Sequence, residues 1–226
     1  MKFKLLLPGL LALLVLSACQ VQPNQREASI VTGHESEIQT IPSSAEFACD
    51  VVFFGDSITA DGNFASLFPE LRVVNLGVYG DTLEDLRQRV PQIQEANPAK
   101  IFLLGGINSL RNDNLEFCEY HYRKLLQEIQ SACPNARIIV QSVLPVDAGL
   151  EKMLCCSNET VRAFNLRLQA FAEEFSLPYV DLWSAYEKDG ALNPELTRDG
   201  VHLRFDVYGL WAELVRPYLE APDSAD

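Results

Sequence analysis

Short runs of apolar, often β-branched residues alternate with longer segments of helical periodicity between residues 48 and 220. The runs contain no regular polar positions, which is typical of strands that are buried on both faces of a parallel sheet. The predicted strands cover residues 49–55, 72–77, 100–106, 136–145 and 178–183. The predicted helices cover residues 82–96, 114–132, 158–176 and 205–220. Strands separated by helices predict a three-layer α/β/α domain with a five-stranded parallel sheet.

A different pattern precedes this domain. Lys2 and Lys4 are followed by an apolar run and then by Leu16-Ser17-Ala18-Cys19, which is typical of an export signal. Leu-Ser-Ala-Cys also resembles a bacterial lipobox, in which the cysteine becomes the lipidated first residue of the mature protein. A plain secretory signal with a chance cysteine is the alternative.

The segment behind the cysteine predicts where the protein resides. Gln20 follows Cys19 and, by resemblance to enterobacterial sorting, a residue other than Asp favours the outer membrane, facing the periplasm or the exterior. The next residues are polar with scattered prolines and predict a flexible tether. We therefore expect a signal peptide at 1–18, a lipidated Cys19 with a tether at 19–46, and one domain at 47–222.

The charge balance restricts the partners. The 226 residues carry a net charge of −13, with 31 acidic residues against 18 lysines and arginines. Such a surface repels phosphate backbones, so no nucleic-acid partner is expected. The chain length suits a single domain with a sizeable core.

Polar and glycine-rich blocks follow four of the predicted strands. In parallel α/β sheets, ligands bind beyond the carboxyl ends of the strands, so these blocks should lie on one rim. The blocks are Gly55-Asp56-Ser57, "NLGVYGDT" at 75–82, "GGINS" at 105–109 and, after a loop, "DGVHL" at 199–203. Their convergence is a stronger signal than any one of them.

Ser57 is the candidate nucleophile, and a serine needs a base to be reactive at neutral pH. Of the three histidines, His34 lies in the predicted tether and His121 lies in the middle of a helix, so His202 is the candidate base. Asp199 precedes it by three residues and can orient the imidazole ring. The alternative is that Asp199 only forms a turn and that His202 is a capping or surface residue.

An acyl-transfer reaction also needs hydrogen-bond donors for the oxyanion. The backbone N–H of Ser57 is available at a helix N-terminus, and Gly80 can present a second backbone N–H from a tight turn. Asn108 can add its side-chain amide. The alternative is that Gly80 and Asn108 are ordinary turn and loop residues.

These blocks resemble the SGNH (GDSL-type) hydrolase family, and the stretch from residue 55 to 82 is similar to its platelet-activating-factor acetylhydrolase-like branch. The resemblance implies a flavodoxin-like sheet of order 2-1-3-4-5 and hydrolysis of esters or thioesters without a metal or cofactor. By position it assigns the nucleophile, the oxyanion hole and the rest of the triad: Ser57, Gly80, Asn108, Asp199 and His202. Many relatives have Asp where Ser109 stands, which puts the hydrogen bonding of that loop in doubt. Asp56 is expected to be structural.

The leading hypothesis is a lipid-anchored serine esterase that acts through an acyl-enzyme. Its substrates would be small-acyl esters such as O-acetylated sugars, or lipid and envelope esters. The alternative is a non-catalytic ligand-binding lipoprotein on a degenerate SGNH fold. All five catalytic positions hold chemically competent residues, which favours the enzyme.

The cysteines give one further expectation, because disulfides persist in exported domains. Cys118 and Cys133 flank one helix and would lie roughly 22 Å apart, too far to be bridged. We predict a bridge from Cys118 to Cys155 or Cys156. Cys118 follows the third predicted strand and the other two follow the fourth, so all three should lie on the same rim of the sheet. A Cys49–Cys133 bridge is a weaker possibility, and five reduced thiols are the alternative.

Overall fold

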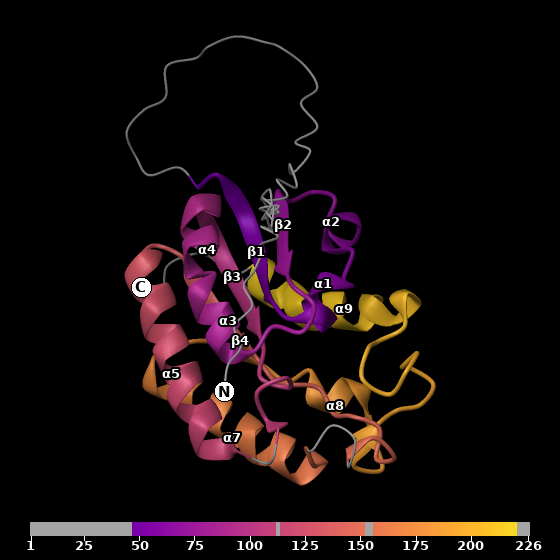
Figure 1. Cartoon of the computed structure of the whole chain (residues 1–226). Coiled ribbons are helices and arrows are strands. Elements are labelled where there is room, and N and C mark those ends of the chain that lie inside the picture. Colours follow the sequence, from indigo (N-terminus) through magenta and orange to yellow (C-terminus); the bar gives the residue numbers. More distant parts are fainter. Residues whose placement is uncertain (1–46, 112–113, 152–155, 221–226) are drawn as a thin grey trace, which may run out of the picture. The chain divides into compact units, whose positions relative to one another are not determined.

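A five-stranded parallel sheet forms the centre of the domain in the computed structural model, which describes residues 47–111, 114–151 and 156–220 (Figure 1). The strand order β2-β1-β3-β4-β5 is the predicted one. The strands are β1 (Cys49–Gly55), β2 (Val73–Gly77), β3 (Pro98–Leu104), β4 (Arg137–Gln141) and β5 (Tyr179–Val180). The predicted signal peptide, Cys19 and the tether lie outside the described residues.

Helices cover both faces of the sheet and confirm the three-layer α/β/α class. Figure 1 shows α3, α4, α5 and α7 on one side, and α9 with α1 and α2 on the other. The long helices are α5 (Leu115–Ala132), α7 (Asn158–Glu174) and α9 (Tyr208–Glu220), the last preceded by the 3₁₀ turn η2 (Phe205–Val207). The short helices are α1 (Ser57–Ala60), α2 (Phe64–Leu67), α3 (Leu83–Gln88), α4 (Val90–Ala96) and α8 (Trp183–Tyr186). A small hairpin joins β6 (Glu187–Lys188) to β7 (Ala191–Leu192).

The helix predicted at 82–96 is divided at Arg89. Pro91 lies in the first turn of α4, where its missing N–H leaves no intrahelical bond unmade. Because Pro91 has no N–H with which to continue the hydrogen-bond ladder of α3, α3 ends at Gln88 and α4 begins at Val90. The break lets the Arg89 side chain reach the carbonyls of Gly55 and Leu76 at the ends of β1 and β2.

Strand β4 ends at Gln141 and not at residue 145 as predicted. Beyond it, side chains of α7 take over the role of a neighbouring strand. Asn165 accepts a bond from Val143 N and donates to Val143 O, and Asn158 pairs with Val146 in the same way. A run of apolar residues therefore continues past the strand without belonging to the sheet.

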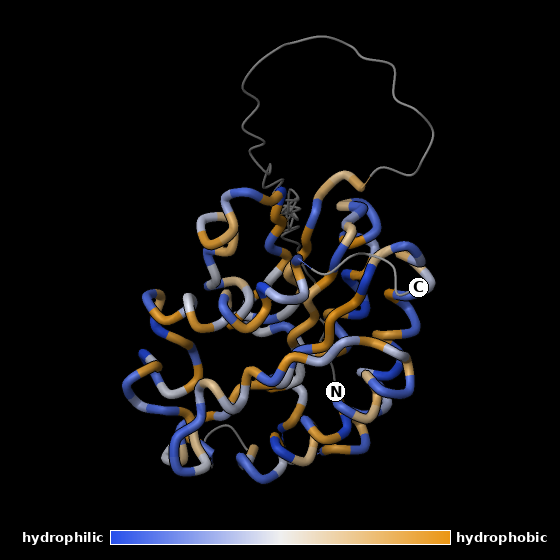
Figure 2. The backbone as a smooth tube through the Cα atoms, turned by 180° about the vertical axis from the view of Figure 1, so that it is seen from behind, coloured by the Kyte–Doolittle hydropathy of each residue, from blue (hydrophilic) through white to orange (hydrophobic). Residues whose placement is uncertain are grey.

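The core consists of the apolar strand residues and the inner helix faces, as the orange segments at the centre of Figure 2 show. Phe53 stacks on Phe64 with ring centroids 3.7 Å apart, and the Phe64 ring meets the Trp211 ring edge-on at 5.2 Å. These contacts pack α2 and α9 against β1. They fix the sheet end from which Ser57 emerges.

The disulfide predicted from Cys118 to Cys155 or Cys156 is not formed, because Cys118 is a buried free thiol in this structure. The Cys118 and Cys156 thiols do lie close enough to interact electrostatically. Burial, with a smaller effect of Cys156, raises the pKa of Cys118 to about 12. Both side chains pack as small apolar groups in the core. Cys155, the other predicted partner, lies outside the described residues.

No helix in the described part of the chain is both long and apolar enough to span a membrane.

Candidate active site

The sharp turn from β1 into α1 presents Ser57 at the rim of the sheet. Asp56 is the N-cap of α1, and its Oδ1 accepts the Ile58 N–H at 3.0 Å. Close packing beneath the turn requires glycine at residue 77, because a Cβ there would lie 2.2 Å from Ala60 N. Asn75 completes the support by donating to the carbonyls of Thr59 and Gly62.

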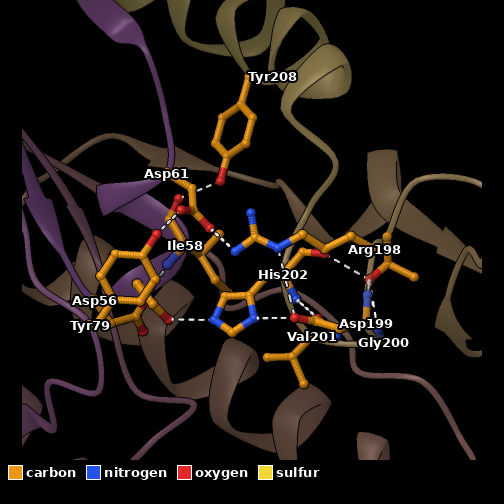
Figure 3. Close-up of polar contacts among 12 residues, drawn as sticks. Asp56, Ile58, Asp61, Tyr79, Arg198, Asp199, Gly200, Val201, His202 and Tyr208 are labelled. Carbon is orange, nitrogen blue, oxygen red and sulfur yellow. Dashed lines mark hydrogen bonds and ion pairs between the residues drawn. The ribbon is translucent and has the colours of Figure 1, made fainter.

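Ser57, His202 and Asp199 form a continuous chain of hydrogen bonds. His202 Nε2 lies 2.9 Å from Ser57 Oγ, and His202 Nδ1 lies 2.8 Å from Asp199 Oδ2 (Figure 3). The carboxylate selects the tautomer with the proton on Nδ1, which leaves Nε2 free to accept the Ser57 hydroxyl proton. The structure therefore brings together the three residues that the sequence predicts as a triad.

Asp199 is held by its own turn. Its Oδ1 accepts backbone N–H groups of Val201 at 3.0 Å and His202 at 2.7 Å. Burial acts to raise the pKa of Asp199, but these bonds and the His202 ring hold the pKa below its usual value. Asp199 is thus an anion at neutral pH, as the orientation of the imidazole requires.

The two further oxyanion candidates come from neighbouring loops. Gly80 has a φ of +80°, a left-handed conformation that favours glycine, and the space beside its Cα is open. The Asn108 amide donates one N–H to Asp81 O at 2.9 Å and carries a second N–H. This bond joins the loop after β3 to the loop that contains Gly80.

Ser109 resolves the question raised by the departure from the family pattern. Its Oγ accepts the Leu83 N–H at 2.8 Å, at the start of α3. A capping box between Thr82 and Asp85 satisfies the adjoining positions. A serine hydroxyl therefore orders this loop in place of a carboxylate.

Arg89 supports this site and was not predicted from the sequence. Its guanidinium donates to Gly55 O and Leu76 O, and pairs with the Asp81 carboxylate at 2.5 Å. Burial raises the pKa of Asp81, and Arg89 opposes that shift. The signal available in the sequence was an arginine at the break before Pro91.

A second buried carboxylate lies directly behind the nucleophile. Asp56 is fully buried, and its Oδ2 has no hydrogen-bond partner within the described part of the chain. Desolvation, with a smaller repulsion from Asp81, raises the pKa of Asp56 to about 7. Asp56 therefore caps α1 and points away from solvent, as expected for a structural residue.

The remaining sequence candidates lie apart from this group. His121 is on α5, where its Nδ1 is 3.1 Å from Arg87 Nη1 and its ring packs on Phe117. His34 lies outside the described residues. Within residues 47–111, 114–151 and 156–220, no cluster of three or more His, Cys, Asp or Glu side chains is arranged to hold a metal.

The fold and this rim are typical of ester hydrolases, and the comparisons with known proteins agree. Residues 53–208 match the model of the GDSL-like Lipase/Acylhydrolase family. The chain belongs to this family and is an SGNH-type ester hydrolase. No curated protein matches the chain.

Solved structures of the same fold come from several bacteria. A Streptococcus pneumoniae protein provisionally described as a platelet activating factor is 26% identical, with a TM-score of 0.65, over 75% of this chain and 83% of its own. A GDSL-like lipase from Bacteroides thetaiotaomicron is 20% identical, with a TM-score of 0.67, over 76% and 88%. The acetylxylan esterase Axe2 from Geobacillus stearothermophilus is 21% identical, with a TM-score of 0.62, over 79% and 97%.

Proposed function

We propose that this chain is a serine esterase that cleaves carboxylic esters or thioesters through a covalent acyl-enzyme. The observation that carries the proposal is the hydrogen-bonded chain from Ser57 through His202 to Asp199. Ser57 Oγ attacks the ester carbonyl while His202 Nε2 accepts the hydroxyl proton. The imidazolium then gives this proton to the leaving alcohol or thiol. Water, deprotonated by the same nitrogen, then attacks the acyl carbon. The bond from the acyl group to Ser57 Oγ breaks, the acid leaves, and Oγ takes the proton back from His202.

The proposed oxyanion hole consists of the backbone N–H groups of Ser57 and Gly80 and the side-chain amide of Asn108. The open space beside Gly80 and the fixed Asn108 amide support this assignment. Donors that are already in place stabilise the developing charge without reorganisation during the reaction.

The proposed substrates are small-acyl esters, such as O-acetylated sugars, or lipid and envelope esters. Structural neighbours that are described as an acetylxylan esterase and a GDSL-like lipase support both classes. The exposed rings of Tyr79 and Phe205 support an amphipathic substrate, because Tyr79 lies 6.3 Å from the His202 ring and Phe205 follows His202 by three residues.

We also propose that the enzyme is a lipoprotein of the cell envelope, anchored through Cys19 and facing the periplasm or the exterior from the outer membrane. The sequence Leu-Ser-Ala-Cys after a short apolar run, with Gln20 behind it, supports this location. An anchored enzyme would meet envelope esters at the membrane surface.

The test is hydrolysis of a series of chromogenic esters from acetyl to palmitoyl, with wild-type protein and Ser57→Ala side by side. We expect turnover by the wild type, a maximum at one acyl length, and loss of turnover in the variant. A variant that hydrolyses the series as fast as the wild type would contradict the proposal.

A further inference from the structure

Asp61 is a buried carboxylate beside the proposed triad. It follows Ser57 by four residues at the end of α1, and its side chain is only 2% exposed. Its Oδ2 lies 2.5 Å from Arg198 Nη2, and its Oδ1 accepts the Tyr79 hydroxyl (Figure 3). Both oxygens are therefore engaged by long-range partners.

These three side chains come from the three segments that supply the proposed catalytic groups. Asp61 closes the helix that begins with Ser57, Tyr79 precedes Gly80, and Arg198 precedes Asp199. One buried carboxylate thus joins the nucleophile helix, the oxyanion loop and the loop of the acid and base. The Tyr208 hydroxyl donates to Ile58 O at 2.6 Å and so holds α1 against α9.

Arg198 lies between two carboxylates that can compete for it. Its Nη2 is 2.5 Å from Asp61, whereas its Nε is 3.8 Å from Asp199 Oδ2. That Asp199 oxygen is the one that accepts His202 Nδ1–H at 2.8 Å. A guanidinium released from Asp61 would have only a short distance to move to pair with the same oxygen.

The guanidinium is held by more than one contact. Its carbon lies 4.8 Å from the centre of the Phe205 ring. Desolvation acts to lower the pKa of Arg198, but Asp61 and, more weakly, Tyr79 and Asp199 raise it above its usual value. Arg198 is therefore always a cation, and the carboxylate with which it pairs determines the position of its guanidinium.

We propose that Asp61 is a positioning residue that holds the Arg198 guanidinium away from Asp199, so that the Asp199 carboxylate remains bound to His202. The inference rests on the proposed triad and adds a residue to it. Asp61 touches neither the substrate nor the reacting atoms in this account. Among the described residues, Arg198 and Tyr79 lie beside the Asp199–His202 pair, and Asp61 is connected to it through Arg198. Asp147 packs against Gly200, the residue after Asp199.

The first test is Asp61→Asn, measured as the pH profiles of kcat and kcat/KM. Without the charge of Asp61, Arg198 pairs with Asp199, and the carboxylate stabilises the protonated imidazole less. We expect kcat to fall by roughly tenfold or more, equivalent to about 1.4 kcal/mol, and the acid limb of the profile to move to lower pH.

The decisive variant adds Arg198→Gln to Asp61→Asn. Removing the competing cation should return the acid limb to its wild-type position and recover part of kcat. Asp206→Asn is the matched control, because Asp206 also pairs with an arginine, Arg204, at 2.7 Å and follows His202 by four residues, and it should leave both profiles unchanged. Tyr79→Phe keeps the Asp61–Arg198 pair and should keep the acid limb.

A loss of kcat with an unmoved acid limb, or no recovery in the double variant, would overturn the proposal and leave Asp61 a structural residue. If Asp61→Asn fails to fold, Asp61→Ser removes the same charge with a smaller side chain and should move the acid limb in the same direction, and an unmoved limb would again overturn the proposal. Failure of the proposed function would look different, since Ser57→Ala would then hydrolyse esters as fast as the wild type.

Discussion

In the proposed mechanism, the reactivity of the Ser57 hydroxyl depends on His202 and Asp199. Ser57 is 6% exposed, and its Oγ lies 2.9 Å from a nitrogen whose ring is fixed by Asp199. Groups that act as a unit give losses that do not add. We therefore predict that Ser57→Ala and His202→Ala each lower kcat by about 10⁶, and that the double variant is only slightly slower. Steady-state kinetics decide this, and multiplicative losses would contradict joint action.

The oxyanion assignment predicts a smaller effect. Asn108→Ala should lower kcat by roughly 10²–10³ with KM little changed, because the lost N–H acts mainly in the transition state. Urea unfolding of the same variant measures the separate effect of losing the bond to Asp81 O. Full activity in Asn108→Ala would show that this amide is not an oxyanion donor.

Asp56 makes stability depend on pH. Its pKa is raised from 3.8 to about 7 in the folded protein, so between these values only the native state keeps the proton. The contribution of the protonated Asp56 to the free energy of unfolding is therefore fully present below about pH 4 and is lost as the pH rises through about 7. Asn at this position retains the Oδ1 cap of Ile58 but cannot ionise.

We therefore predict that Asp56→Asn becomes more stable relative to the wild type on going from pH 4.5 to pH 8. The relative gain is at most about 4 kcal/mol, since one pKa unit corresponds to ~1.4 kcal/mol. Urea unfolding at the two pH values measures it. A stability difference that is the same at both would contradict the raised pKa.

At the scale of elements, Arg89 connects the ends of two strands to the loop that follows them. Removing it leaves the Asp81 carboxylate, which is 9% exposed, without its cation. We predict that Arg89→Met lowers the free energy of unfolding by about 3–5 kcal/mol. Adding Asp81→Asn should recover part of the loss. If the double variant is no more stable than Arg89→Met, the buried charge is not the cause.

The sequence allowed the regular elements to be predicted where periodicity is strong. All five strands and the long helices α5 and α7 follow from apolar runs and from 3.6-residue spacing. The break at Arg89 was missed because Pro91 is compatible with the start of a helix as well as with its interruption. Helix α1 has only four residues, too few to show a period.

The site was predictable only where the order of the strands places its residues. Residues at strand exits converge by topology alone, which brought Ser57, Gly80, Asn108 and the segment with His202 onto one rim. The Asp61–Arg198 pair spans 137 residues and follows no spacing rule, so only the structure reveals it. The predicted bridge from Cys118 to Cys155 or Cys156 was wrong, because a shared rim does not fix the bond geometry that a disulfide needs.

The proposed lipid anchor at Cys19 would hold an acidic enzyme at a membrane surface. We predict that Cys19→Ser blocks lipidation, so that the mature protein leaves the membrane fraction while its esterase activity is retained. Fractionation and labelling with palmitate measure this. A Cys19→Ser protein that still fractionates with membranes and still incorporates palmitate would contradict the anchor.

Whether Ser57 is an activated nucleophile is measured by the reaction of the wild-type protein with a fluorophosphonate, followed by mass spectrometry of the labelled peptide. An activated serine predicts one adduct per chain, on Ser57, and greatly slowed labelling in His202→Ala. Ester hydrolysis should stop in proportion to the labelled fraction. An unlabelled Ser57 in fully active protein, or an adduct at another residue that accounts for the inactivation, would contradict the account.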